Sequence, residues 1–180
     1  MQSKIIFSIN FAVTKLILRN IYSYIQSNLQ FGIILWGNST FINKIFKVQK
    51  RIVRTICKAH PTAPCRPLFK EIKILTIYDL YILECCLFAH SNYDLLNTNR
   101  TYHEHNTRHK NNLKLTATTL SVIMKGPHNS LIKIYNKLPD ALKILPKNKF
   151  KKNLLQLLVQ RNFYNMSEYF QNDFTSINDF

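Results

Sequence analysis

Hydrophobic and charged positions separate most clearly between Phe41 and Lys58, a stretch that reads FINKIFKVQKRIVRTICK. At about 100° per residue, its apolar residues recur along one side of a helix. This apolar stripe contains Ile45, Val48, Ile52 and Ile56, and it is widened by Phe46 and Val53. A set of cations falls within an arc of roughly 80°, centred about 120° from the stripe. These cations are Lys44, Lys47, Arg51, Arg54 and Lys58, with Lys50 beside them. The pattern predicts an amphipathic helix with a basic face.

The flanks of this helix contain ordinary start and stop signals. Ser39 or Thr40 can cap its first turn with a side-chain oxygen, and Pro61 predicts an end near His60. Residues 4–31 show helical spacing, and the apolar run GIILWG at 32–37 fits either a strand or a helix. Thr76 is the expected cap of a later helix. Further helices are expected at 66–71, 77–92, 130–137, 142–145 and 150–162, the last with Phe150, Leu154, Leu157 and Leu158 as its buried stripe.

Two segments lack the helical period. Residues 92–112 are rich in Asn and Thr and predict a long polar loop. Residues 113–124 contain alternating and β-branched positions, which allow at most a short β-hairpin. The sequence therefore predicts a mainly α fold, with one helical domain over residues 1–164 and a short tail over 165–180.

The charge is strongly one-sided. The chain has 25 Lys and Arg against 9 Asp and Glu, a formal charge of +16, and all its acidic residues lie at Glu71 or later. Like charges on one helix face repel each other unless a polyanion lies against them. Further cations are Arg108 and Lys110 in the polar loop and a second cluster of Lys143, Lys147, Lys149, Lys151 and Lys152, of which the last three are the expected phosphate contacts. Together these residues predict contacts with the phosphate backbone of RNA or DNA that do not read its sequence.

Few residues offer catalytic chemistry. No Asp-Asp or Asp-x-Asp group occurs, so the carboxylate cluster of a two-metal centre is not expected. The His103–His109 cluster could hold a metal or supply a general base, as in a His-Asn-His nuclease, but its setting is typical of a solvated loop. Cys57, His60 and Cys65 match no common zinc spacing. With three glycines, a Gly-rich phosphate loop is excluded too. We expect no catalytic residue, metal, cofactor or small-molecule substrate in this chain.

Cysteine usage and hydropathy bear on location. The four cysteines form no C-x-x-C pair and are expected to be free, buried thiols in a reducing compartment. The apolar run at residues 5–13 lacks a small-residue cleavage site, and no apolar segment approaches the length that spans a bilayer. The expectation is an intracellular protein, nuclear or cytoplasmic, that is not secreted and has no membrane partner.

Several sequence words carry a family resemblance. They are YSYIQSNLQFGIILWGNS, KIFKVQKRIVRTI, CRPLFKEIKILTIYDLYILECCLF, HNTRHKNNLKL, KIYNKLPDALK, FKKNL and FYNMSEYF. In their order and spacing they resemble the region downstream of the polymerase core in non-LTR, LINE-type, Jockey-like retrotransposon reverse transcriptases. The words cover nearly all of residues 16–174. None of them is a catalytic motif, so the resemblance depends on their being collinear.

The resemblance implies a parent with an endonuclease, a polymerase with fingers and palm, and then a thumb with further segments. This chain resembles only the thumb and the segments downstream of it. The aromatic-x-Asp-Asp word of the palm, which holds Mg²⁺ in the family, is not in the sequence. The resemblance thus implies a truncated, non-catalytic fragment of an RNA-directed DNA polymerase, whose basic helix would grip the template–product duplex. The alternatives are an active polymerase subunit that works with a separate palm domain, a nuclease that uses the histidine loop, and a degenerate fragment with no function.

Overall fold

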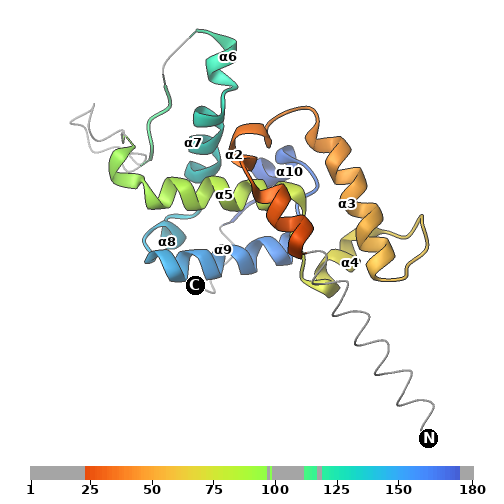
Figure 1. Cartoon of the computed structure of the whole chain (residues 1–180). Coiled ribbons are helices and arrows are strands. Elements are labelled where there is room, and N and C mark those ends of the chain that lie inside the picture. The colour runs from red at the N-terminus through yellow and green to blue at the C-terminus, as the bar shows by residue number, and fades with distance from the viewer. Residues whose placement is uncertain (1–22, 97, 99–111, 117–118, 175–180) are drawn as a thin grey trace, which may run out of the picture.

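A computed structural model describes residues 23–96, 98, 112–116 and 119–174. The described part is mainly helical, as predicted, and contains no strand. Residues 23–30 are helical and precede α2 (Ile33–Trp36), α3 (Ile42–Ile56), α4 (Cys65–Ile72), α5 (Ile77–Ser91), η1 (Tyr93–Leu95), α6 (Ser121–Met124), α7 (Pro127–Lys137), α8 (Asp140–Lys143), α9 (Lys147–Arg161) and α10 (Met166–Gln171) (Figure 1).

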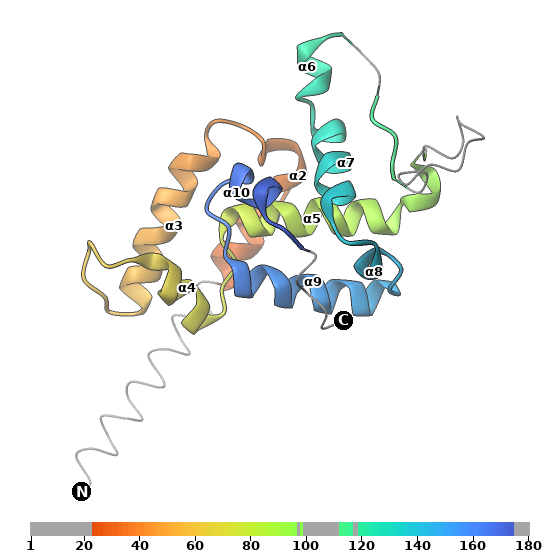
Figure 2. The ribbon, with the colours of Figure 1, turned by 180° about the vertical axis from the view of Figure 1, so that it is seen from behind.

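Helix α5 is the centre of the fold. It packs against α2, α3, α7 and α9, and it runs through the middle of the molecule in both views (Figures 1 and 2). Its buried residues lie on every side and are Ile77, Tyr78, Asp79, Leu80, Tyr81, Ile82, Leu83, Cys85, Cys86 and Ala89. A helix that is apolar all round belongs inside a core. The sequence predicted one stripe on this helix, and the structure buries most of its circumference.

The start of α5 is fixed by the predicted cap. The Thr76 side chain accepts a hydrogen bond from the Asp79 backbone N–H at 3.1 Å, and the Asp79 carboxylate accepts one from the Thr76 N–H at 3.2 Å. The other Asp79 oxygen accepts a hydrogen bond from the Phe163 N–H at 3.1 Å. This reciprocal capping box satisfies free amides of the first turn and ties the segment after α9 to the central helix.

Helix α9 and the segment after it complete the core. The predicted stripe on α9 is confirmed, because Phe150, Leu154, Leu157 and Leu158 are all buried. Helix α10 lies in the segment that the sequence set apart as a tail, and it packs on the same core. Tyr169 of α10 is fully buried and its hydroxyl donates to the Ile134 carbonyl at 2.8 Å.

Three local elements differ from their sequence predictions. The run at 32–37 forms the short helix α2. Helix α3 begins at Ile42 after Phe41, without a side-chain cap, and it ends at Ile56, so neither Ser39 nor Thr40 caps it. Residues 121–124 form a turn of helix, and Leu113 makes only an isolated antiparallel bridge with Thr98. The predicted helices before residue 23 lie outside the described residues.

Candidate nucleic-acid interface

The buried face of α3 decides which of its cations reach solvent. Ile42, Phe46, Gln49, Val53 and Ile56 are its buried residues. The Phe46 ring packs edge-on against two tyrosine rings of other segments, with centroids 5.3 Å and 4.9 Å away. Gln49 bonds the chain just before α5, with Nε2 donating to the Leu75 carbonyl and Oε1 accepting from the Ile77 N–H, both at 2.9 Å. These contacts fix the rotation of α3 on the core.

This rotation differs from the one predicted. Val48, expected in the buried stripe, is 51% exposed, while Phe46 and Val53 lie at the centre of the buried face. At 100° per residue, the buried residues span roughly 80° of the helix circumference. Lys44, Lys47 and Arg51 are exposed and fall within roughly 60°, almost opposite the buried face. The basic face therefore points directly away from the core.

We define the outer basic face as Lys44, Lys47, Arg51 and Lys58. Lys58 follows the helix with left-handed backbone geometry (φ 50°) and is also exposed. In the described part of the chain, no carboxylate lies within ion-pair distance of Lys44, Lys47 or Arg51. Helix α3 lies at the edge of the molecule, beside α4 (Figures 1 and 2). A row of cations on an outer helix, without acidic neighbours, produces a positive potential that favours polyanions.

Lys50 and Arg54, which the sequence placed with this set, are half-buried and turn toward the domain. The Lys50 ammonium lies 4.7 Å from the centroid of the Phe46 ring, and Arg54 Nε donates to the Ala63 carbonyl at 2.9 Å. The first contact is a cation–π interaction, and the second holds the loop between α3 and α4. Both side chains stabilise the edge of the domain, and both are less exposed than Lys44, Lys47 and Arg51.

The second predicted cluster lies elsewhere. Lys149, Lys151 and Lys152 are exposed on the first turns of α9. This end of α9 adjoins α8, whereas its other end approaches α4, so the two clusters lie at separate ends of the molecule (Figures 1 and 2). Arg108, Lys110 and the His103–His109 cluster lie outside the described residues. The structure therefore presents two separate basic surfaces.

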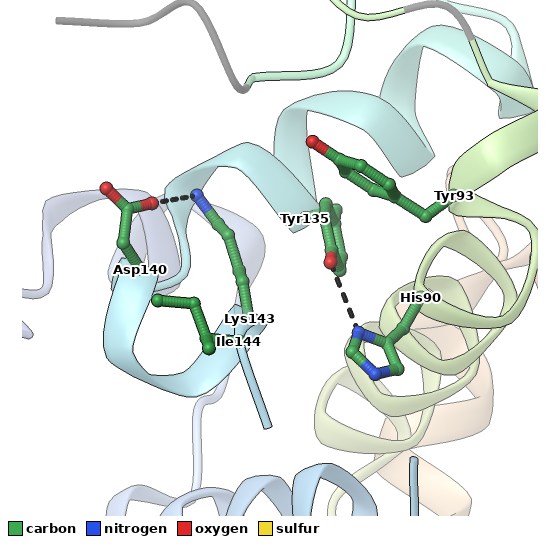
Figure 3. A pocket seen from close by; sticks show the side chains of 6 residues that line it. All are labelled: His90, Tyr93, Tyr135, Asp140, Lys143 and Ile144. Carbon is green, nitrogen blue, oxygen red and sulfur yellow. Dashed lines mark hydrogen bonds and ion pairs between the residues drawn. The ribbon is translucent and has the colours of Figure 1, made fainter. Parts of the chain in front are cut away.

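A cavity of about 490 Å³ opens beside the second cluster (Figure 3). Its lining comes from α5, η1, α7 and α8 and consists of His90, Tyr93, Tyr135, Asp140, Lys143 and the residue after α8, Ile144. None of these six was a predicted contact residue, although Lys143 belongs to the second basic cluster. Tyr135, Asp140 and Lys143 lie in the word KIYNKLPDALK, and the packing of the helices brings them to His90 and Tyr93, which lie much earlier in the chain.

A ring stack and a hydrogen bond hold the His90 side chain in the wall of this cavity. The His90 ring stacks on Phe150, with centroids 4.0 Å apart, and its Nδ1 lies 3.2 Å from the Tyr135 hydroxyl. Burial lowers the pKa of His90, and the nearby charge of Lys147 lowers it too, against a hydrogen bond to the Leu145 backbone. The cavity thus has a fixed aromatic wall.

Metal and thiol chemistry finds little support in the described residues. They contain no group of three or more His, Cys, Asp or Glu side chains placed to hold a metal ion. In the described residues none of the four cysteines forms a disulfide; Cys65, Cys85 and Cys86 are buried, as predicted, whereas Cys57 is half-buried. Burial raises the pKa of Cys85 to about 12 and also raises that of Cys86, which keeps both thiols protonated and unreactive.

A helix that spans a membrane must be long and apolar. Over the described residues, every helix is too short or too polar to pass through a bilayer.

Comparison of the chain with protein-family models, curated proteins and solved structures finds no match. The resemblance to non-LTR reverse transcriptases thus remains an expectation drawn from the sequence words.

Proposed function

We propose that this chain binds the phosphate backbone of duplex nucleic acid through the outer basic face of α3, without reading its sequence. The observation that carries the proposal is the placement of Lys44, Lys47 and Arg51 opposite the buried face. Helix residues three and four apart are neighbours on the surface, about one turn of 5.4 Å along the axis. Three cations in such a row match a polyanion with closely spaced charges.

The composition of the face supports backbone contact over base readout. Lys and Arg side chains fix a protein on phosphates, whereas sequence is read by groups that enter a groove and match base edges. The exposed neighbours of the row include Asn43, Val48 and Thr55, which are short. A single helix face with long cationic side chains and short neighbours can contact phosphates of a nucleic acid whatever its base sequence.

We further propose that the chain is a non-catalytic C-terminal fragment related to a non-LTR RNA-directed DNA polymerase. The sequence words support this descent, and a thumb-like duplex grip agrees with the basic helix. The free thiols fit a reducing intracellular compartment. Any polymerase activity would need a separate palm domain as partner, and primer extension with Mg²⁺ by the purified chain alone would contradict the non-catalytic assignment.

The first prediction concerns charge reversal on α3. The triple variant Lys44→Glu, Lys47→Glu, Arg51→Glu should bind a 20-bp duplex about 100-fold more weakly, or worse, at low salt, because three phosphate contacts become repulsions. Fluorescence anisotropy with a labelled RNA–DNA or DNA duplex measures the change. All three side chains are exposed, so the thermal midpoint should stay close to that of the parent.

A matched control separates the effect of the outer basic face from the effect of a lower net charge. Lys149→Glu, Lys151→Glu, Lys152→Glu makes the same charge change at the other end of the molecule. It should keep most of the duplex affinity. The proposal fails if the α3 variant binds as tightly as the parent, or if both triple variants lose affinity equally.

A further inference from the structure

We propose that the cavity between α5, α7 and α8 binds one unpaired nucleobase of a single strand, whose phosphates lie along the lysines at the start of α9. This inference rests on the proposed function in assuming a nucleic-acid partner. It concerns a second surface, at the opposite end of the molecule from α3 (Figures 1 and 2).

The cavity is large enough for a nucleobase and has an aromatic wall on which a base can stack. Its volume of about 490 Å³ exceeds what a planar base needs and leaves room for part of the sugar. Tyr93 and Tyr135 lie with ring centroids 6.2 Å apart on one side, and His90 continues the aromatic wall (Figure 3). Every base has a π-face, so an aromatic wall accepts a base whatever its identity. Stacking of this kind strengthens binding by about 5- to 150-fold per base.

The opposite side of the cavity has groups that suit the other face and the edge of a base. Ile144 is 82% exposed, which leaves an apolar side chain at the rim. The Asp140 carboxylate, with its side chain 79% exposed, can accept a hydrogen bond from a base N–H. Lys143 Nζ lies 3.0 Å from Asp140 Oδ1, 3.2 Å from the Asn136 carbonyl and 5.9 Å from the centroid of the Tyr135 ring, so this cation closes the inner side of the cavity. The rim therefore presents an apolar side chain and a hydrogen-bond acceptor.

The start of α9 brings cations to the same place. Phe150 packs beneath His90, and the charge of Lys147 acts on the His90 ring, so the first turn of α9 lies against the cavity. Lys151 follows Lys147 by one turn on the same side of the helix. Lys149 and Lys152 are exposed beside them. An aromatic cavity next to a row of cations is the arrangement that binds single strands by stacking and phosphate contact together.

The test compares two single strands of equal length and charge. One is a ten-nucleotide DNA strand, and the other is its abasic counterpart with the same phosphates and sugars. The parent should bind the strand with bases about tenfold more tightly. Tyr93→Ala should remove this preference and leave the affinity for the abasic strand almost unchanged.

A second variant protects the test against a folding defect. Ile144→Asp changes an exposed side chain and should also abolish the preference for bases. Leu35→Asp, on α2 and 73% exposed, adds the same charge away from the cavity and should retain the preference.

Equal binding of both strands by the parent, or a preference that survives both cavity variants, overturns the proposal. A chain that binds duplex through α3 but ignores bases overturns this proposal alone. A chain that binds neither probe overturns the proposed function as well.

Discussion

Replacing Gly37 by alanine is expected to lower the free energy of unfolding by about 3 kcal/mol, since overpacking a core typically costs about 1–3 kcal/mol. A Cβ at this position would lie 2.3 Å from Cδ2 of Tyr81 and 2.6 Å from the Ile33 carbonyl oxygen. The Tyr81 ring is fully buried in α5, and the Ile33 oxygen belongs to the backbone, so neither can move cheaply. Thermal unfolding should show a midpoint lower by roughly 6–12 °C.

Gly32→Ala is the matched control, because it makes the same chemical change at the other end of α2. Gly32 has φ 62°, and its added Cβ would meet nothing closer than 4.0 Å. Its cost is only the strain of a left-handed alanine, about 1–2 kcal/mol. If Gly37→Ala is as stable as the parent, the close packing of α2 on α5 is incorrect.

The second large effect is the pH dependence of stability at Asp79. Burial raises the pKa of this carboxyl from 3.8 to about 7 in the folded chain, although three hydrogen bonds from Thr76 and Phe163 oppose the shift. A raised pKa means that the folded state holds the proton more tightly than the unfolded state does. The stabilisation is therefore complete below pH 3.8 and is lost as the pH rises through about 7.

Asp79→Asn tests this dependence. Integrating over the pKa difference gives roughly 4 kcal/mol of stability lost by the parent across that pH window, and the asparagine variant should not show this loss. Urea unfolding of both proteins between pH 4 and 8 gives the difference directly. Asp94→Asn removes a carboxylate from an exposed position and should leave the profile of the parent intact. Parallel profiles for the parent and Asp79→Asn would contradict the burial of this carboxyl.

The helices with strong local signals could be predicted from the sequence. Thr76 marks the start of α5, and the spacing of Phe150, Leu154 and Leu157 marks the buried side of α9, because caps and periodicity act within a few residues. Residues 121–124 were harder, since β-branched side chains favour strands only where a neighbouring strand can pair with them. Helix α10 was not predicted because it is only six residues long and has one buried residue, Tyr169, so a helical period cannot show in it.

The sequence predicted that the cations of α3 share one side of the helix, but it did not predict how α3 is rotated on the core. A helical wheel placed the cations of α3 on one side, but it could not choose between Val48 and Phe46 as the centre of the buried face. That choice depends on aromatic partners from other segments and on Gln49, a polar residue whose burial is permitted by two backbone hydrogen bonds. The same tertiary contacts explain why Arg54 binds a loop carbonyl instead of facing solvent.

The cavity beside α8 could not be predicted from the sequence. Tyr93 and Tyr135 belong to different helices, and no spacing rule connects them. Only the packing of α7 against α5 places their rings together.

The salt dependence of duplex binding tests the central claim most directly, because each phosphate contact releases counterions. The measurement compares the parent with Lys47→Gln/Arg51→Gln, using one duplex between about 50 and 300 mM salt. Removing two phosphate contacts should make the slope of log affinity against log salt shallower by about 2, one for each cation. An unchanged slope would show that the outer basic face of α3 does not contact phosphates, and it would contradict the account.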